Sequence, residues 1–332
     1  MQPSVATRQG PSPSVPGVID TIAAGLTIAL AQPLLMTVPV LLDLYYWIGW
    51  RLTVPGLTAK IRQWLDASGS SEADSINDTL NRLGQSDATE LISLFVPSLL
   101  AAVPREDVYT LGDRPIFAIN NWALGLLAIV ALIVLMAGAY MLYMVILADA
   151  ALERTRSVRA TARAVAVAWL RFLGLLALIT ALFTLVLGPP AFLWTVMSVL
   201  GIGFGAILVP MMVVAGIVMT VLLIFTPEAI AVAEVGPLRA IYLSFNVVRQ
   251  YVWQTLALLL ASLIITSGLG ELWERLANTP PGLLTAVIAN AFFAGGLTVA
   301  GMIFFNDRLR AWRPSAAGGR QGSPTTQSKS DR

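Results

Sequence analysis

The chain has 332 residues, of which 57% are hydrophobic and 12% are charged, with a formal net charge of +2 and a mean hydropathy of +0.76. Because a soluble domain carries about 25% charged residues, this composition excludes an ordinary soluble protein and indicates a membrane protein. The chain contains no cysteine and no histidine, which excludes disulfides, thiolate and imidazole catalysis and the common zinc, haem and iron–sulfur sites. We therefore expect no cofactor, and the small net charge gives no reason to expect nucleic acid as a partner.

The N-terminal part divides into a polar leader and a long apolar block. Residues 1–17 are rich in Pro and Ser and predict a disordered leader without the features of a cleaved signal peptide. Residues 18–50 form the first span with an interfacial extension, and Pro33 and Pro39 predict a kink in it. Asp43 lies among aromatic residues, so it is either an acid at the water–lipid boundary or a functional intramembrane acid.

Residues 51–119 are the one long hydrophilic stretch and predict an extracytoplasmic helical cap. Apolar residues recur at helical spacing in two segments, which indicates two amphipathic helices separated by a polar turn: Leu57, Ile61, Trp64 and Leu65, then Ile76, Leu80 and Leu83. Residues 90–103 are apolar but too short to span a membrane, and we expect an interfacial or re-entrant helix there.

A basic bridge, residues 148–171, connects two apolar runs and contains five arginines: Arg154, Arg156, Arg159, Arg163 and Arg171. On a helix, Arg156, Arg159 and Arg163 make one stripe, and the opposite side holds Val158, Ala162, Val165 and Trp169. One interpretation is an interfacial helix whose arginines contact anionic lipid phosphates, with Trp169 at the acyl boundary. The alternative is a helix packed on neighbouring spans with solvated arginines. Either way, the positive-inside bias places the bridge in the cytoplasm.

Residues 120–306 predict a five-span membrane domain, followed by a disordered cytoplasmic tail over 307–332. The expected spans are 122–147, 169–187 (ended by Gly188-Pro189-Pro190), 206–225, 252–269 and 282–305. Whether 191–225 crosses once or twice is open, and Gly201, Gly203 and Gly205 within it are a candidate hinge. A second, less charged bridge covers 227–250.

The two bridges indicate an internal repeat and a topology. Val158-Arg159-Ala160 aligns with Leu238-Arg239-Ala240, which predicts a span–bridge–span unit present twice, although chance amphipathic patterning also explains the match. With six spans, both termini and both bridges share one side. That side holds 14 of the 21 basic residues, so we expect an inner (cytoplasmic) cell membrane protein with both termini in the cytoplasm.

The stretch PEAIAVAEVGPLRAIYLSFNVVRQYVWQTLALLL and its earlier echo resemble bacterial multi-pass proteins related to the membrane domain of glycerophosphoryl diester phosphodiesterase and to YciC-type proteins. The resemblance covers roughly residues 120–305. It implies a six-helix membrane fold without assigned catalytic residues, since the phosphodiesterase activity belongs to a separate soluble domain. No functional residue is carried over from it.

Three classes of function are compatible with these observations. The first is a non-enzymatic membrane protein that organises lipid or a membrane partner, which includes a second copy of itself. The second is a transporter of a small solute or lipid, which broken spans and a repeat favour but span centres almost free of ionisable groups disfavour. The third is a membrane enzyme, for which the sequence offers only scattered acids such as Asp43, Glu106, Asp107 and Asp113. We expect the first.

Overall fold

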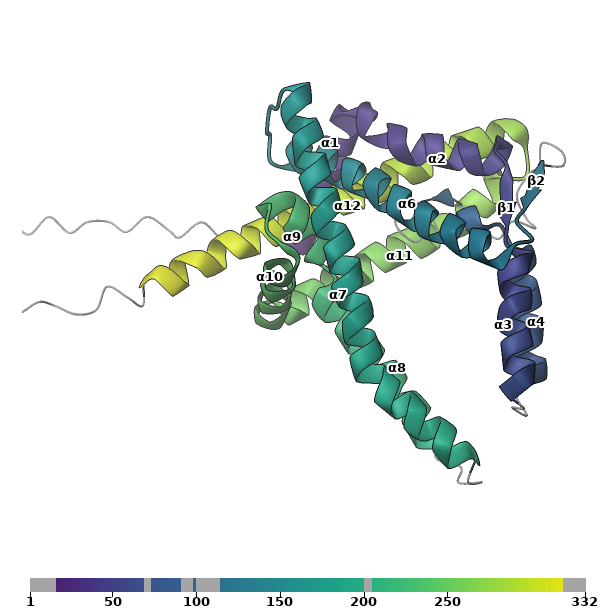
Figure 1. Ribbon diagram of the computed structural model, residues 1–332. Helices are drawn as coiled ribbons and strands as arrows, with labels where there is room; N and C mark the ends of the chain where they lie inside the picture. The colour runs from purple at the N-terminus through teal and green to yellow at the C-terminus, as the bar shows by residue number, and fades with distance from the viewer. Residues whose placement is uncertain (1–15, 69–72, 91–97, 100–113, 200–204, 319–332) are drawn as a thin grey trace, which may run out of the picture.

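The fold is an all-α helical bundle, as the sequence predicts (Figure 1). The computed structural model describes residues 16–68, 73–90, 98–99, 114–199 and 205–318. Five of the described helical segments are long and apolar enough to cross a membrane, and a sixth is added if the bent N-terminal pair counts as one broken span. These helices indicate a multi-pass membrane protein.

The N-terminal block is bent by 95° between α1 (Val18–Ala31) and the segment formed by η1 (Pro33–Met36) and α2 (Thr37–Ile48). Gln32 leaves the helical region with φ −128° and ψ 75°, because a residue that precedes proline is disfavoured in the α conformation. Pro39 lies in the first turn of α2, where its missing N–H breaks no helical hydrogen bond. The predicted kink is confirmed, and Pro33 explains it.

This bent segment lies along α12 (Pro280–Gly318) between Leu283 and Arg308. Arg308 of α12 donates to the Pro16 carbonyl at one end, and Gly25 packs against Gly296 in the middle. At the other end, Val40 and Trp47 pack on a buried cluster that comprises Leu99, Trp273, Ala277, Leu283, Ala286 and Val287. The two ends of the segment therefore contact parts of α12 that lie far apart along that helix, near Leu283 and at Arg308, which is consistent with one broken crossing.

The basic bridge is not a separate helix. Residues 148–151 belong to α6 (Trp122–Ala151), residues 152–157 form a linker, and α7 (Val158–Val199) continues without a break into the third apolar run. The stretch after Ser157 contains no proline and is rich in alanine, so nothing in it ends a helix. The prediction of a bridge helix followed by a new span at Trp169 was wrong.

Helix α7 also continues beyond Gly188, where the sequence predicts its end. Pro189 and Pro190 lie inside the helix. Each proline removes one helical hydrogen bond, but leaving the helix within lipid would leave several backbone groups unsatisfied. Helix α8 (Gly205–Leu223) returns alongside α7, and the two form a helical hairpin. A pocket between them is lined by apolar and small residues: Leu182, Phe183 and Val186 on α7, and Ala215, Gly216, Val218 and Met219 on α8.

The predicted second bridge divides into two elements with different surroundings. Helix α9 (Thr226–Ala233) is buried in the core, and α10 (Pro237–Gln250) is amphipathic and lies nearer the surface. A break at Tyr251 separates α10 from α11 (Val252–Leu276). Helix α12 continues to Gly318, so the prediction of a disordered tail from residue 307 was wrong as far as residue 318, and 319–332 lie outside the described residues.

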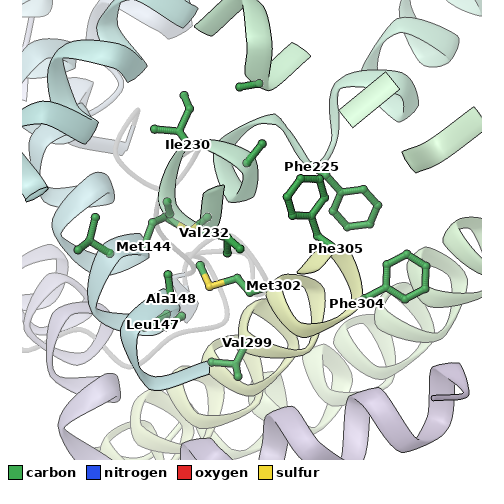
Figure 2. Close-up of a cluster of buried hydrophobic side chains, with 14 of the residues drawn as sticks. Met144, Leu147, Ala148, Phe225, Ile230, Val232, Val299, Met302, Phe304 and Phe305 are labelled. Carbon is green, nitrogen blue, oxygen red and sulfur yellow. The ribbon is translucent and has the colours of Figure 1, made fainter. Parts of the chain in front are cut away.

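The main core is built where α6, α9 and α12 meet. Figure 2 shows Met144, Leu147 and Ala148 of α6 facing side chains of the α9 region and of α12. Phe225 stacks on Phe304 with ring centroids 5.6 Å apart. Burial is concentrated here because the outer faces of the long helices carry apolar residues that lipid would cover.

The cap is anchored at the end of the bundle where α6 begins. Strand β1 (Arg51–Thr53) pairs in parallel with β2 (Ile116–Ala118), and α3 (Pro55–Ser68) and α4 (Ala73–Gln85) form a helical hairpin, as the sequence predicts. Asp87, which follows α4, links that helix to the segments of the two strands. It accepts a hydrogen bond from the Leu52 amide of β1 and pairs with Arg114, which precedes β2. Most of the predicted helix at 90–103 lies outside the described residues.

Asp43 joins α2 to this cap. Its carboxylate is buried and accepts from the Leu99 amide, with both oxygens 3.0 Å from the nitrogen. The chain's own backbone therefore binds Asp43, and its position at the water–lipid boundary stays a prediction.

Candidate functional site: an arginine junction beside an apolar groove

Two linkers meet at the end of the bundle that holds the start of α1. Glu153 is the second residue of the α6–α7 linker and Glu234 the first residue of the α9–α10 linker, and both glutamates adopt the left-handed conformation, with φ 51° and 53°. Among the described residues these are the two non-glycine residues with positive φ. Such a residue commonly ends a helix, although glycine is usual there. Each glutamate thus turns the chain out of a core helix.

Glu234 forms ion pairs with two arginines of the α6–α7 linker. Arg154 Nη1 lies 3.0 Å from Glu234 Oε1 and its Nη2 donates to the Val232 carbonyl at 2.8 Å. Arg156 also pairs with Glu234 and places its Nε 3.1 Å from Asp149 Oδ1. These contacts fix the two linkers to each other.

The arginine junction, defined as Asp149, Arg154, Arg156, Arg171 and Glu234, keeps an excess of positive charge. Arg171 donates to the Glu234 carbonyl at 2.6 Å and not to a carboxylate. Three guanidinium groups therefore face two carboxylates, which leaves a net charge of +1. Two further arginines, Arg159 and Arg163, are exposed on the first turns of α7.

An open groove begins at this junction. It has a volume of about 510 Å³ between α6 and α7, and apart from Arg156 and Thr161 its walls are apolar: Leu142, Val158, Ala162, Val165, Ala166 and Trp169. Around α7, Arg159 lies about a quarter of a turn and Arg163 more than a third of a turn from the middle of this apolar face, on the side of the arginine stripe. The groove thus has an apolar trough that begins at a cationic junction, a combination that matches the two parts of a phospholipid.

The predicted arginine stripe is divided in the structure. Arg156 is engaged by Asp149 and Glu234, whereas Arg159 and Arg163 are exposed. Trp169 donates its indole N–H to the Val134 carbonyl at 2.9 Å and packs on Gly138. The contacts of Arg156 and Trp169 within the chain leave Arg159 and Arg163 as the arginines of the stripe that are available to a lipid, and their lipid contact stays a prediction.

The structure describes one of the three glycines of the candidate hinge. Gly201 and Gly203 lie outside the described residues, and Gly205 is the first residue of α8.

Sequence reasoning missed Glu228, which lies on α9 within the core. Its Oε2 is buried without a hydrogen-bond partner, and a Cβ placed on Gly301 of α12 would lie 3.9 Å from its Oε1. The Tyr143 hydroxyl of α6 is likewise buried without a partner. The sequence Thr226-Pro227-Glu228 reads as an ordinary helix start, where an acid complements the helix dipole, so its only signal was an acid directly after an apolar run.

Arg308 is a second buried charge, and the sequence placed it in the disordered tail. It is 1% exposed, donates to the Pro16 carbonyl and to Gln254, and lies 4.2 Å from the centroid of the Phe304 ring. Arg308 therefore joins α1, α11 and α12 through neutral acceptors and an aromatic face.

Within the described part of the chain, no group of three or more Asp or Glu side chains is arranged to hold a metal ion. Comparison with protein-family models, curated proteins and solved structures gives no significant match. The resemblance to the glycerophosphodiesterase membrane domain and YciC-type proteins therefore rests on the sequence pattern alone.

Proposed function

We propose that this chain is a non-enzymatic membrane protein that holds anionic phospholipid in the groove between α6 and α7. The observation that carries the proposal is the groove itself, an apolar trough that starts at a junction with excess positive charge. An acyl chain would lie along Val165 and Leu142, and the headgroup phosphate would contact Arg159 and Arg163. This is the chemistry that a basic amphipathic surface offers to a charged leaflet.

The sidedness of this site is part of the proposal. The sequence places 14 of 21 basic residues on the side of the two linkers, and the contacts of Arg308 and Glu234 bring the start of α1, both linkers and the end of α12 to one end of the bundle. By the positive-inside rule that end is cytoplasmic. We place the protein in the cytoplasmic membrane of the cell and keep the proposed kinship with YciC-type proteins.

Reversal of Arg159 and Arg163 to glutamate tests the lipid site without disturbing the ion pairs of Arg156. Each arginine near an anionic surface contributes about 1 kcal/mol, so loss of both attractions weakens anionic lipid binding by about 2 kcal/mol, roughly 30-fold. Native mass spectrometry of the purified protein with phosphatidylglycerol should show this loss.

The matched control is the double variant Lys60→Glu and Arg275→Glu, which changes the net charge equally at exposed sites near the other end of the bundle. It should retain the lipid of the wild type. Equal retention of phosphatidylglycerol by the Arg159/Arg163 variant and by this control would contradict the proposal.

A transporter of small solute or lipid is the second candidate, and one observation favours it. Glu228 carries a buried oxygen without a partner inside the bundle, and ionisable groups in membrane interiors commonly mark transport pathways. A fluorescent phosphatidylglycerol in vesicles containing the wild-type protein separates the two functions. A transporter exposes lipid of both leaflets to a quencher added outside, whereas a lipid-holding protein leaves the inner leaflet protected.

A further inference from the structure

The α3–α4 hairpin is held together by polar contacts. Along its antiparallel seam, Arg62 donates to Asn81 and Asn77 donates to Asp66 at 3.2 Å. Near the base, Gly84 lies directly against Thr58, since a Cβ on Gly84 would lie 2.2 Å from the Thr58 hydroxyl oxygen. The seam between the two helices is therefore lined by polar and small residues.

Three large apolar side chains of the same hairpin are outside the seam. Trp64 is 79% exposed, Leu83 is 54% exposed and Ile61 is 39% exposed. A helical hairpin in water places its apolar residues between the helices and its polar residues outside. This hairpin has the reverse arrangement, so its outer apolar surface requires an apolar environment.

These exposed residues share one side of the hairpin with the partly buried Leu57 and Leu80. Leu57, Ile61 and Trp64 lie at i, i+4 and i+7 on α3, and Leu80 and Leu83 lie at i and i+3 on α4. On each helix this edge is rotated from the seam by roughly a third of a turn. Because the helices are antiparallel, the two rotations bring both edges to the same side.

That side faces the membrane-spanning part of the chain. Leu57, the first residue of the α3 edge, packs on Gly125 in the first turn of α6, where a Cβ on Gly125 would lie 3.4 Å from the Leu57 Cβ. Ile61 and Trp64 lie further along the same edge of α3, after Leu57. Figure 1 shows the hairpin leaving the start of α6 and running across the direction of α6 and α11.

Other exposed apolar residues mark a membrane boundary at this level. Trp50, Phe117 and Trp122 are each about half exposed or more and lie where the cap joins α6. Exposed tryptophans at one level are typical of the membrane–water interface. From there an open groove continues along the outer side of α6 past Leu124 and Leu127. The apolar side of the hairpin is thus continuous with the lipid-facing surface of a span.

We propose that the α3–α4 hairpin lies flat in the lipid interface at the membrane face where α6 begins. Ile61, Trp64 and Leu83 enter the acyl boundary, while Gln63 and Arg82, on the opposite side of the hairpin, face water. The occupant of this apolar side is the bilayer, and the proposal is independent of the lipid groove between α6 and α7.

Single cysteines test this proposal because the chain has no native cysteine. A nitroxide spin label is attached in turn to Ile61→Cys, Trp64→Cys, Leu83→Cys, Gln63→Cys and Arg82→Cys. The full-length proteins are reconstituted into phosphatidylcholine–phosphatidylglycerol vesicles. Relaxation by oxygen, which concentrates in lipid, is compared with relaxation by a water-soluble nickel complex.

The first three labels should show an oxygen-to-nickel accessibility ratio several-fold above that of the labels at Gln63 and Arg82. All five positions are exposed, and they sample both helices, so misfolding of one variant does not decide the result. High nickel accessibility at all five sites would place the hairpin in water. Shielding of the first three sites from both reagents would mean that a protein surface covers them. Either result overturns the proposal.

Discussion

At the scale of single residues, two glutamates with the same backbone conformation have different surroundings. Glu153 and Glu234 both adopt positive φ, a conformation that costs a residue other than glycine roughly 1 kcal/mol. Glu153 is exposed, and the described residues offer it no ion pair. Glu234 binds Arg154 and Arg156. The ion pairs of the Glu234 side chain therefore offset the free-energy cost of a backbone conformation that glycine would adopt more easily.

This contrast predicts different effects of the same substitution. Glu234→Gln keeps the backbone and the shape but removes the charge that two partly exposed arginines share. Each such pair contributes up to about 1 kcal/mol, so we expect a destabilisation of about 1 kcal/mol that shrinks as salt is added. Glu153→Gln is the matched control and should leave stability unchanged. Equilibrium unfolding in detergent at low and high salt measures both, and equal stability of the two variants would contradict the role of the junction.

At the scale of elements, a close helix contact joins α1 to α12 through small residues. A Cβ on Gly25 would lie 2.4 Å from the Gly296 carbonyl oxygen and 2.6 Å from the Ala300 nitrogen. The neighbouring atoms are backbone and cannot move aside without shifting a helix. Small residues allow such close approach between membrane helices, where packing replaces the hydrophobic driving force.

Gly25→Ala should therefore destabilise the protein by about 1–3 kcal/mol, the usual range for overpacking. The matched control is Gly268→Ala on α11, where an added Cβ meets nothing within 4 Å. That substitution should be neutral or stabilise by up to about 1 kcal/mol, because alanine has the higher helix propensity. Thermal unfolding in detergent compares the two. A Gly25→Ala variant as stable as Gly268→Ala would show that α1 is not packed as closely as described.

The elements also show what the sequence can and cannot predict. Length and apolarity predicted the spans that include α6, α11 and α12, and Pro33 predicted the bend, because these signals are local. The continuity of α7 through Pro189 and the burial of α9 were not predictable in this way. Both depend on surroundings: lipid disfavours broken backbone hydrogen bonds, and α9 is buried because α6 and α12 cover it.

In the candidate site, too, local features were predictable from the sequence and features that depend on packing were not. The arginine-rich stretch was visible in the sequence, but the partners of Arg156 come from α6 and from a linker that follows three further helices. Glu228 and Arg308 were missed because an acid at a helix start and an arginine in a polar tail have ordinary local patterns. Only the packing of α9 and α12 makes them buried charges.

At the scale of the whole molecule, the bundle has two chemically different ends. One end holds the arginine junction, the start of α1 and the buried Arg308. The other holds the α3–α4 hairpin, the two short strands and a set of exposed aromatic residues. This polarity underlies the two proposals, in which anionic lipid binds at the first end and the hairpin rests on the membrane at the second.

Labelling of one exposed position at each end with a membrane-impermeant maleimide tests this arrangement most directly. Gln63→Cys on α3 should react in intact cells, whereas Ser157→Cys in the first linker should react only after the membrane is permeabilised. Reaction of both positions from the same side would contradict the separation of the two ends across the membrane. Reaction of Ser157→Cys alone in intact cells would contradict the cytoplasmic location of the arginine junction.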